Sequence, residues 1–144
     1  MMVQQILNSK TNDDVITVTP GTTLVEAAAV LTQHKIGTVV ISENGKEASG
    51  ILSERDIVRA ISHRGATALG APVSDFMTRK LVTCRREATA DQVLTIMTNK
   101  RFRHIPVVDN GKMIGLITQG DVVKAKLSEL AMEKDALEGM IMGY

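Results

Sequence analysis

A chain of 144 residues is about the size of one domain, and its formal net charge of +1 argues against a strongly basic nucleic-acid binder and against a charge-rich disordered segment. Apolar residues make up 44% and aromatic residues 2%, so the chain can build a core but lacks the rings of a base-stacking platform. The single cysteine, Cys84, excludes an internal disulfide and fits a reducing compartment.

Apolar spacing and turn residues predict a short helix, a strand, a helix, two strands and a helix in the first half of the chain. The predicted elements are one or two helical turns within Met1–Asp14, a strand Val15–Val18, a helix capped by Thr22 or Thr23 that runs through Leu24 and Leu31, strands Thr38–Ile41 and Ser49–Leu52, and a helix from Glu54 to His63. Asn44-Gly45 between the two later strands is the strongest short hairpin signal. We expect the last helix to bury Ile57, Val58 and Ile61.

The second half predicts the same order of elements after a linker at Ser62–Ala71, which is rich in glycine, alanine and serine. The predicted elements are strand Leu81–Cys84, helix Ala90–Lys100, strand Ile105–Val108, the turn Asn110-Gly111, strand Met113–Ile117 and a helix from Gly120. Each half is therefore a β-α-β-β-α unit, and we expect an α+β fold of two pseudo-symmetric repeats packed as one module, over residues 1–68 and 69–144.

The two halves also align residue by residue. Segment Val15–Lys35 matches Leu81–Arg101, and Gly50–Asp56 matches Gly115–Asp121 with the offset shortened by one residue. The helical positions that correspond are Leu24, Ala27, Ala28 and Leu31 in the first half, and Ala90, Val93, Leu94 and Met97 in the second. An internal repeat of this kind determines the fold class. Two facing copies build two similar clefts, which favours a binding module over a catalyst.

The last predicted helix is longer than its counterpart and carries an apolar seam. Its members alternate spacings of four and three, interrupted by Lys134: Val123, Leu127, Leu130, Leu137, Ile141 and Tyr144. Gly139 and Gly143 weaken the end of this helix. The seam fits either an amphipathic helix lying on its own domain or a helix that pairs across a dimer, and we favour the pairing.

The sequence resembles a known family at three places. Each half closes with Gly-apolar-apolar-Ser/Thr-x-x-Asp, Val73-x-x-Phe76-Met77-Thr78 precedes the second copy, and the run Arg103–Asp109 lies within it. Together these motifs resemble a tandem pair of CBS domains (a Bateman module) of the small stand-alone bacterial type, over nearly the whole chain. The resemblance implies a homodimer that binds adenosine ligands such as AMP, ATP, NAD(H) or S-adenosylmethionine. Where the family often has Thr before the motif Asp, this chain has Arg55 and Gly120, and Gly120 leaves only backbone for a contact.

Ser53-x-x-Asp56 and Thr118-x-x-Asp121 each follow a predicted strand and open a predicted helix. A carboxylate at the third helical position can accept hydrogen bonds from both hydroxyls of a ribose, and the amides of the first turn can meet phosphate. The same spacing is also an N-terminal capping box. The two roles are compatible if capping is given up when a ligand enters.

The remaining predicted ligand contacts serve adenine and phosphate. Adenine needs apolar walls and backbone groups at its edge, and phosphate needs a cation. The predicted contacts are backbone groups of Thr17, Val18, Thr83 and Cys84, walls at Ile36, Gly37, Thr38, Ile105 and Pro106, and phosphate contacts at Arg55, Arg103 and His104. The alternatives are plain core strands and a solvated basic face. Because only the second repeat carries the basic run Lys100–His104, we expect the two sites to differ.

No motif for catalysis or metal binding is found. The three histidines have no metal-ligand spacing with one another or with Cys84, and there is no phosphate loop or nucleophile elbow. We therefore expect a regulatory or sensor module that acts on an unidentified partner protein, is not an enzyme and needs no cofactor. No leader opens the chain and no apolar run approaches the ~20 residues that span a bilayer, so we expect a cytoplasmic protein without a membrane partner.

The rival interpretation is a structural dimerisation platform without a ligand. Nucleic acid binding rests on Lys100–His104 alone and is disfavoured.

Overall fold

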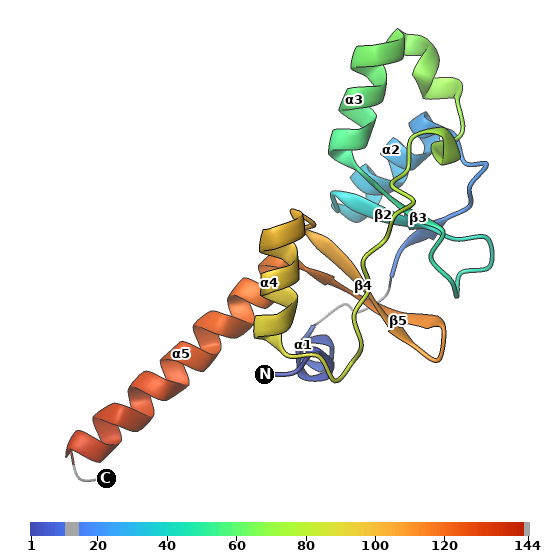
Figure 1. Cartoon of the computed structure of the whole chain (residues 1–144). Helices are drawn as coiled ribbons and strands as arrows, with labels where there is room; N and C mark the ends of the chain where they lie inside the picture. The colour runs from blue at the N-terminus through green and yellow to red at the C-terminus, as the bar shows by residue number, and fades with distance from the viewer. Residues whose placement is uncertain (11–14, 143–144) are drawn as a thin grey trace. The chain divides into compact units, whose positions relative to one another are not determined.

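The structure, a computed structural model, describes residues 1–10 and 15–142 (Figure 1). Its elements are α1 (Val3–Ser9), β1 (Thr17–Val18), α2 (Leu24–His34), β2 (Thr38–Ile41), β3 (Gly50–Ser53), α3 (Glu54–Arg64), 3-10 helices Gly65–Gly70 and Val73–Asp75, α4 (Ala90–Lys100), β4 (His104–Asp109), β5 (Lys112–Thr118) and α5 (Gln119–Met142). They form two compact units. The first-repeat unit holds the described residues of 14–82 and 109–114, and the second-repeat unit holds those of 1–13, 83–108 and 115–144.

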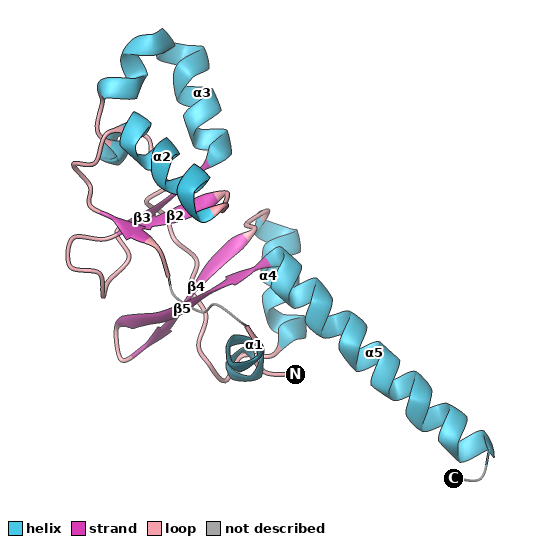
Figure 2. Ribbon diagram, turned by 180° about the vertical axis from the view of Figure 1, so that it is seen from behind, coloured by secondary structure: helices cyan, strands magenta, loops and turns pink. Residues whose placement is uncertain are grey.

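The first-repeat unit contains a three-stranded sheet in the order β1-β2-β3, covered by α2 and α3 (Figure 2). Strand β1 is parallel to β2, and β2 is antiparallel to β3 with Thr38 opposite Ser53. Helix α2 begins at Thr23, whose hydroxyl accepts the amide of Glu26 at 3.3 Å, as the predicted cap requires. The apolar positions of α2, β2, β3 and α3 meet in one core. The predicted element order is confirmed.

Helix α3 buries a narrower face than the sequence pattern predicts. Ile57 and Ala60 are buried, whereas Val58 is 67% and Ile61 41% exposed. The expectation that α3 buries all three of Ile57, Val58 and Ile61 is therefore wrong. Each residue advances about 100° around a helix, so a helix that contacts its core along one line leaves Val58 and Ile61 on the neighbouring face.

The predicted linker at Ser62–Ala71 is an ordered part of the unit. Its first residues complete α3, and the rest form the 3-10 helix Gly65–Gly70, in which Ala68 is fully buried in the core. The 3-10 helix contacts both α2 and α3, although most of its residues are exposed. The predicted linker is therefore part of the first-repeat unit.

The second-repeat unit packs α1, α4 and the first part of α5 around β4 and the end of β5. Strands β4 and β5 are neighbours, joined by Asn110-Gly111, whose φ values of 51° and 78° fit the predicted tight turn. The predicted strand Leu81–Cys84 is reduced to one parallel bridge, between Cys84 and Val107. Only Cys84 of this segment is buried, so sheet pairing does not extend toward Leu81.

Helix α5 has 24 residues and confirms the predicted long C-terminal helix. In the second-repeat unit it continues well past the end of α4 (Figure 1). Tyr144, the last member of the predicted seam, and Gly143 lie outside the described residues. Over residues 1–10 and 15–142, no helix combines the length and the apolar character needed to cross a membrane.

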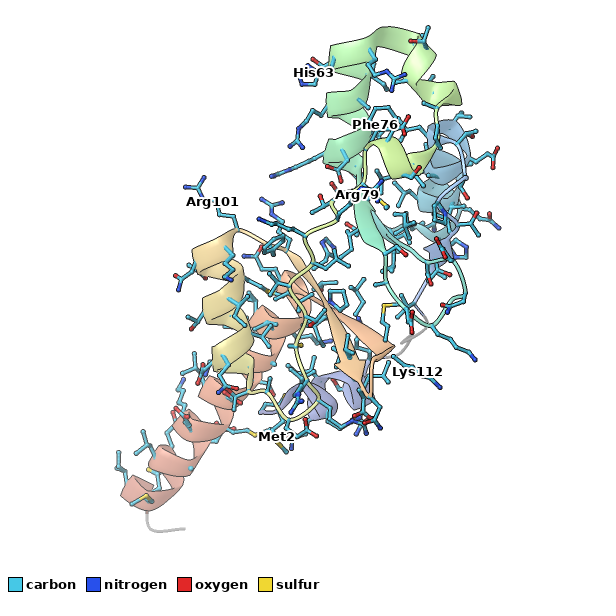
Figure 3. All side chains as sticks on the ribbon, turned by 45° about the vertical axis from the view of Figure 1, so that its right-hand side comes forward. Met2, His63, Phe76, Arg79, Arg101 and Lys112 are labelled. Atoms are coloured by element: carbon cyan, nitrogen blue, oxygen red, sulfur yellow. The ribbon has the colours of Figure 1, made fainter. Side chains whose placement is uncertain are left out.

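The core of each unit includes the short segment that precedes the other repeat in the chain. We call residues 3–10, before the first repeat, and residues 73–80, before the second, the leading segments. The Val3 amide donates to the Ala88 carbonyl and the Val73 amide to the Thr22 carbonyl, both at 2.8 Å. Both valines are fully buried. The leading segment of the first repeat thus belongs to the second-repeat unit, and that of the second repeat to the first-repeat unit. In the latter, Phe76 lies near α3, with the Arg64 guanidinium 5.2 Å from its ring centre (Figure 3).

The motif glycines make this exchange possible. A Cβ atom at Gly115 would lie 2.7 Å from Leu7 Cδ2, and one at Gly50 would lie 2.5 Å from Met77 Sδ and 3.0 Å from the Thr78 carbonyl oxygen. Cβ contacts shorter than 3.0 Å essentially do not occur, so a side chain at Gly115 requires Leu7 to shift, and one at Gly50 requires Met77 to shift. The glycine of Gly-apolar-apolar-Ser/Thr-x-x-Asp is therefore a packing requirement.

We expect Gly115→Ala to destabilise the protein by about 1–3 kcal/mol, because inserting a carbon into a filled core forces side chains off their rotamers. The matched control is Gly21→Ala, since a Cβ at Gly21 meets no atom within 4 Å. Urea unfolding of both variants measures the difference. Equal stability of Gly115→Ala and Gly21→Ala would contradict the proposed role of this glycine.

Candidate functional site

The motif carboxylate of the first repeat sits at the third residue of α3. Its Oδ2 accepts hydrogen bonds from the Ser53 amide at 2.8 Å and from the Ser53 hydroxyl at 3.2 Å. In return, the Asp56 amide donates to the Ser53 hydroxyl at 3.4 Å. Asp56 Oδ1 faces the Arg59 guanidinium at 3.5 Å. The side chain of Asp56 is only 11% exposed, so the backbone holds it in one orientation.

The second repeat places its motif carboxylate in the same way at the third residue of α5. Asp121 Oδ2 accepts the Thr118 amide at 2.9 Å, and the Asp121 amide donates to the Thr118 hydroxyl at 3.1 Å. The reciprocal bonds of a capping box are therefore present in both repeats. The ribose role remains a prediction, which requires that a ligand share or replace the capping contacts.

Lys10, which the sequence analysis did not select, holds the carboxylate of the second repeat. Its Nζ lies 2.9 Å from Asp121 Oδ2 and 2.9 Å from the carbonyl oxygen of Leu116. Burial raises the pKa of Asp121, but the Thr118 amide and the Lys10 ammonium outweigh it and bring the pKa below its ordinary value. The carboxylate of the second repeat is thus ionised and paired with a cation.

Asp121 and Lys10 line a cavity of about 350 Å³ in the second-repeat unit. Its walls come from the N-terminal residue, α1, the residue after α1, and α5: Met1, Ile6, Ser9, Lys10, Asp121, Lys124, Ala125 and Ser128. Two lysines, two hydroxyls and one carboxylate therefore share one concavity. This set of groups can accept from hydroxyls and donate to an anion.

The predicted wall segments meet the start of the motif helix in both repeats. The amide of Glu54, the first residue of α3, donates to the Gly37 carbonyl at 2.9 Å, and the amide of Gln119 donates to the Arg103 carbonyl at 2.8 Å. Gly37 and Arg103 occupy corresponding positions before β2 and within the loop that leads to β4. Gly37 and Arg103 therefore each lie beside the first turn of the motif helix of their own repeat.

Other predicted contacts are committed to the sheets. The Cys84 amide donates to the Pro106 carbonyl at 3.0 Å and its carbonyl accepts the Val108 amide at 2.9 Å, while the Val18 carbonyl accepts the Ser42 amide at 2.9 Å. Ile105 is fully buried in the core of its unit. Thr17 lies on the edge strand β1, opposite Val40.

A second hollow, of about 880 Å³, lies beside α4 in the second-repeat unit. Its lining consists of Thr83, Cys84, Arg85, Glu87, Ala88, Asp91, Gln92, Thr95 and Ile96. Thr83 and Cys84 line this hollow, whereas Asp121 lines the cavity beside α1. The structure therefore does not gather all predicted contacts of the second repeat around one concavity.

The basic residues predicted to bind phosphate are mostly exposed. Arg55 lies in the first turn of α3, and Arg103 lies just before β4. Arg101, at the end of α4, points outward (Figure 3). His104 is half-buried, and its pKa is lowered by burial, with smaller opposing and reinforcing effects of Asp121, Arg103 and Lys10.

The structure also bears on nucleophilic catalysis and on metal binding. Burial raises the pKa of the Cys84 thiol to about 11, so the thiol stays protonated and is a poor nucleophile. Among residues 1–10 and 15–142, no cluster of three histidine, cysteine or acidic side chains is arranged to hold a metal ion.

A repeated spacing could have pointed to Lys10. Val3-x-x-Ile6-Leu7-x-x-Lys10 matches Val73-x-x-Phe76-Met77-x-x-Lys80, so the repeat includes the leading segments. The corresponding carbonyls have different donors, however: Leu116 accepts from the Lys10 side chain, and Ile51 accepts from the Thr78 amide at 2.9 Å. The asymmetry between the sites thus extends beyond the basic run.

Comparison with known proteins identifies the family of the chain. The sequence model of the CBS domain matches residues 3–63 and 73–128, so each match begins at a buried valine of a leading segment. The chain belongs to the CBS domain family. A CBS-domain containing protein from Agrobacterium tumefaciens has a similar crystal structure, with a TM-score of 0.83, 44% identity, and coverage of 88% of this chain and 99% of that one.

Two other CBS proteins are informative. The mitochondrial CBS domain-containing protein CBSX3 of Arabidopsis thaliana is 36% identical over 125 residues, which is 84% of this chain and 61% of that protein, so the chain spans less than two thirds of its length. The crystal structure of CBSX2 in complex with AMP has a TM-score of 0.72 and 25% identity, and covers 88% of this chain and 96% of that one. The tandem CBS fold expected from the motifs is therefore confirmed.

We expect Lys10→Gln to raise the pKa of Asp121, because the ammonium that stabilises the carboxylate is lost. Since folding lowers this pKa, the stabilisation from ionised Asp121 is present above the unfolded value and is lost as pH falls through the folded value. The stability difference between wild type and Lys10→Gln should therefore shrink on acidification. NMR titration of the carboxyl carbon measures the pKa.

The control for this titration is Lys134→Gln, which removes the same charge from the exposed part of α5. An Asp121 pKa that is the same in Lys10→Gln and Lys134→Gln would show that the Lys10 contact has no electrostatic role.

Proposed function

We propose that this CBS protein is a non-catalytic regulator that binds an adenine nucleotide, AMP, ATP or NAD(H), in each repeat and acts as a homodimer in the cytoplasm. The observation that carries the proposal is the identical placement of Asp56 and Asp121 at the third position of α3 and α5, directly after a strand. The AMP complex of CBSX2, a protein of the same fold, supports the choice of ligand.

The cavity around Asp121 has the groups that a nucleotide requires. The Asp121 carboxylate accepts hydrogen bonds from the ribose hydroxyls, and Lys10 lies on the same walls to neutralise a phosphate. Hydrogen bonds to charged groups are worth about 1.5–3 kcal/mol each. The contacts of Asp121 with ribose and of lysine with phosphate, together with apolar contacts, therefore account for affinity in the micromolar range. Because Lys10 already pairs with Asp121, the site favours a ligand that brings its own negative charge over an uncharged nucleoside.

Binding at Asp121 would act on the fold through the leading segment. Lys10 directly follows α1, and its hydrogen bond to Asp121 links the end of α1 to α5. A nucleotide that binds Asp121 in place of Lys10 removes this link. A ligand shifts a conformational equilibrium only by its difference in affinity for the two states. The competition between Lys10 and ribose for one carboxylate supplies such a difference.

A second candidate function is a dimerisation platform without a physiological ligand. The exposed apolar residues of α5 favour it, since Leu127, Leu130 and Leu137 are each more than half exposed. The two functions differ in their response to nucleotide, which the following measurement tests.

We expect AMP, ATP or NAD(H) at one hundred times its dissociation constant to stabilise the protein by about 2.7 kcal/mol, which raises the melting temperature by roughly 5–10 °C. Asp121→Asn and Asp56→Asn should each remove one site per chain in calorimetric titration, and the double variant should remove both. Asp135→Asn, on the exposed part of α5, is the matched control. No shift with AMP, ADP, ATP, NAD, NADH or S-adenosylmethionine would favour the platform.

We expect Arg103→Ala to weaken AMP binding about tenfold at the second-repeat site, because a guanidinium that donates two hydrogen bonds to phosphate is replaced by a methyl group. Lys100→Ala removes a neighbouring exposed charge and serves as the control. Unchanged AMP affinity in Arg103→Ala would show that Arg103 does not contact the phosphate.

A further inference from the structure

The outer part of α5 carries an apolar stripe that its own unit leaves uncovered. Leu127, Leu130, Leu137 and Ile141 are between 56% and 82% exposed. Their spacing alternates three and four around Lys134, so they lie along one side of the helix. Every residue from 130 to 138 is exposed, and α5 projects from the second-repeat unit (Figure 1).

The base of α5, in contrast, is held firmly. Val122 and Ala125 are buried in the core. Lys126 pairs with Asp91 of α4 at 2.7 Å and with Glu129 at 2.9 Å, and both carboxylates raise the pKa of Lys126. The projecting part is therefore a helix of fixed direction, already shaped to receive a partner at little cost in ordering.

We propose that this stripe binds the same stripe of a second copy, so that two α5 helices pair in antiparallel orientation about a two-fold axis near residue 132. The proposal rests on the homodimer of the proposed function and names its interface. In this register Val123 packs against the partner's Ile141 and Leu127 against the partner's Leu137. Leu130 packs against the aliphatic stem of the partner's Lys134.

The charges beside the stripe fit the antiparallel pair. Lys124 lies opposite the partner's Glu138, and by symmetry this pair occurs twice. At the axis the small Ala131 meets its own copy on one edge of the stripe, and Glu133 meets its own copy on the other edge, where Lys134 of each chain lies beside the two carboxylates. The isologous contact is thus complementary to itself, as a two-fold dimer requires.

The parallel arrangement is disfavoured by the same residues. A parallel pair in register places Lys134 against the partner's Lys134 inside the seam, and Glu133 against the partner's Glu138 at its edge. Like charges in these positions oppose pairing, so the sequence of α5 selects the antiparallel orientation.

Sedimentation velocity of the full chain over a concentration series tests the interface. We expect wild type to be a dimer, and Leu137→Glu to raise the dimer dissociation constant at least tenfold. Ala136→Glu adds the same charge one position away, on the exposed side opposite the stripe, and should leave dimerisation unchanged. A monomeric wild type, or equal dimerisation of the two variants, would overturn the proposal.

Disulfide formation tests the orientation. Positions 124 and 138 are about 21 Å apart along one helix, too far for a disulfide within a chain, and Cys84 is buried. We expect the double variant Lys124→Cys/Glu138→Cys to give a covalent dimer on oxidation, and each single variant to give none. A covalent dimer from Glu138→Cys alone, or none from the double variant, would overturn the antiparallel register.

These outcomes are separable from those of the proposed function. Circular dichroism verifies that Leu137→Glu is folded, and the nucleotide-induced melting shift is measured on the same sample. A shift without dimerisation refutes the interface alone, and dimerisation without any shift refutes nucleotide binding alone.

Discussion

The contact of each leading segment with the motif glycine of the other repeat is the constraint on which the rest of this structure depends. Leu7 occupies the space over Gly115, and Met77 occupies the space over Gly50. A backbone hydrogen bond also joins each segment to the unit that contains it. The Val3 amide donates to Ala88 in the loop before α4, and the Val73 amide donates to Thr22 in the loop before α2. Because every compact unit includes a segment from outside its own repeat, a single repeat lacks part of its core. The core of each unit is therefore built from both repeats.

The exchange also makes the two candidate sites unequal. It brings Lys10 to the carboxylate of the second repeat, where its ammonium contacts both Asp121 and the Leu116 carbonyl. In the first repeat the corresponding carbonyl is bonded by the backbone of Thr78, and Asp56 faces Arg59 of its own helix. Displacing Lys10 from Asp121 would release the end of α1, whereas displacing Arg59 from Asp56 would affect only α3 itself. Two sites with the same motif can thus serve different affinities and different effects.

Local patterns in the sequence were sufficient to predict most elements. The internal repeat, the tight turn at Asn110-Gly111, the cap at Thr23 and the long α5 each depend on residues close together in the chain, whereas the tight turn predicted at Asn44-Gly45 is wrong because a longer loop joins Ile41 of β2 to Gly50 of β3. The failures concern long-range packing. Exposure of Val58, loss of the strand before Cys84 and the approach of Lys10 to Asp121 depend on which surfaces meet, and propensity and periodicity do not contain that information.

If these sites bind nucleotide, the motif carboxylates exchange part of their capping role for a ribose, and a crystal structure of the chain with AMP tests this exchange. We expect both ribose hydroxyls within hydrogen-bond distance of the Asp121 or Asp56 carboxylate, with Lys10 moved from Asp121 Oδ2 toward the phosphate in the second repeat. AMP bound elsewhere, with both capping boxes and the Lys10 contact unchanged, would contradict it.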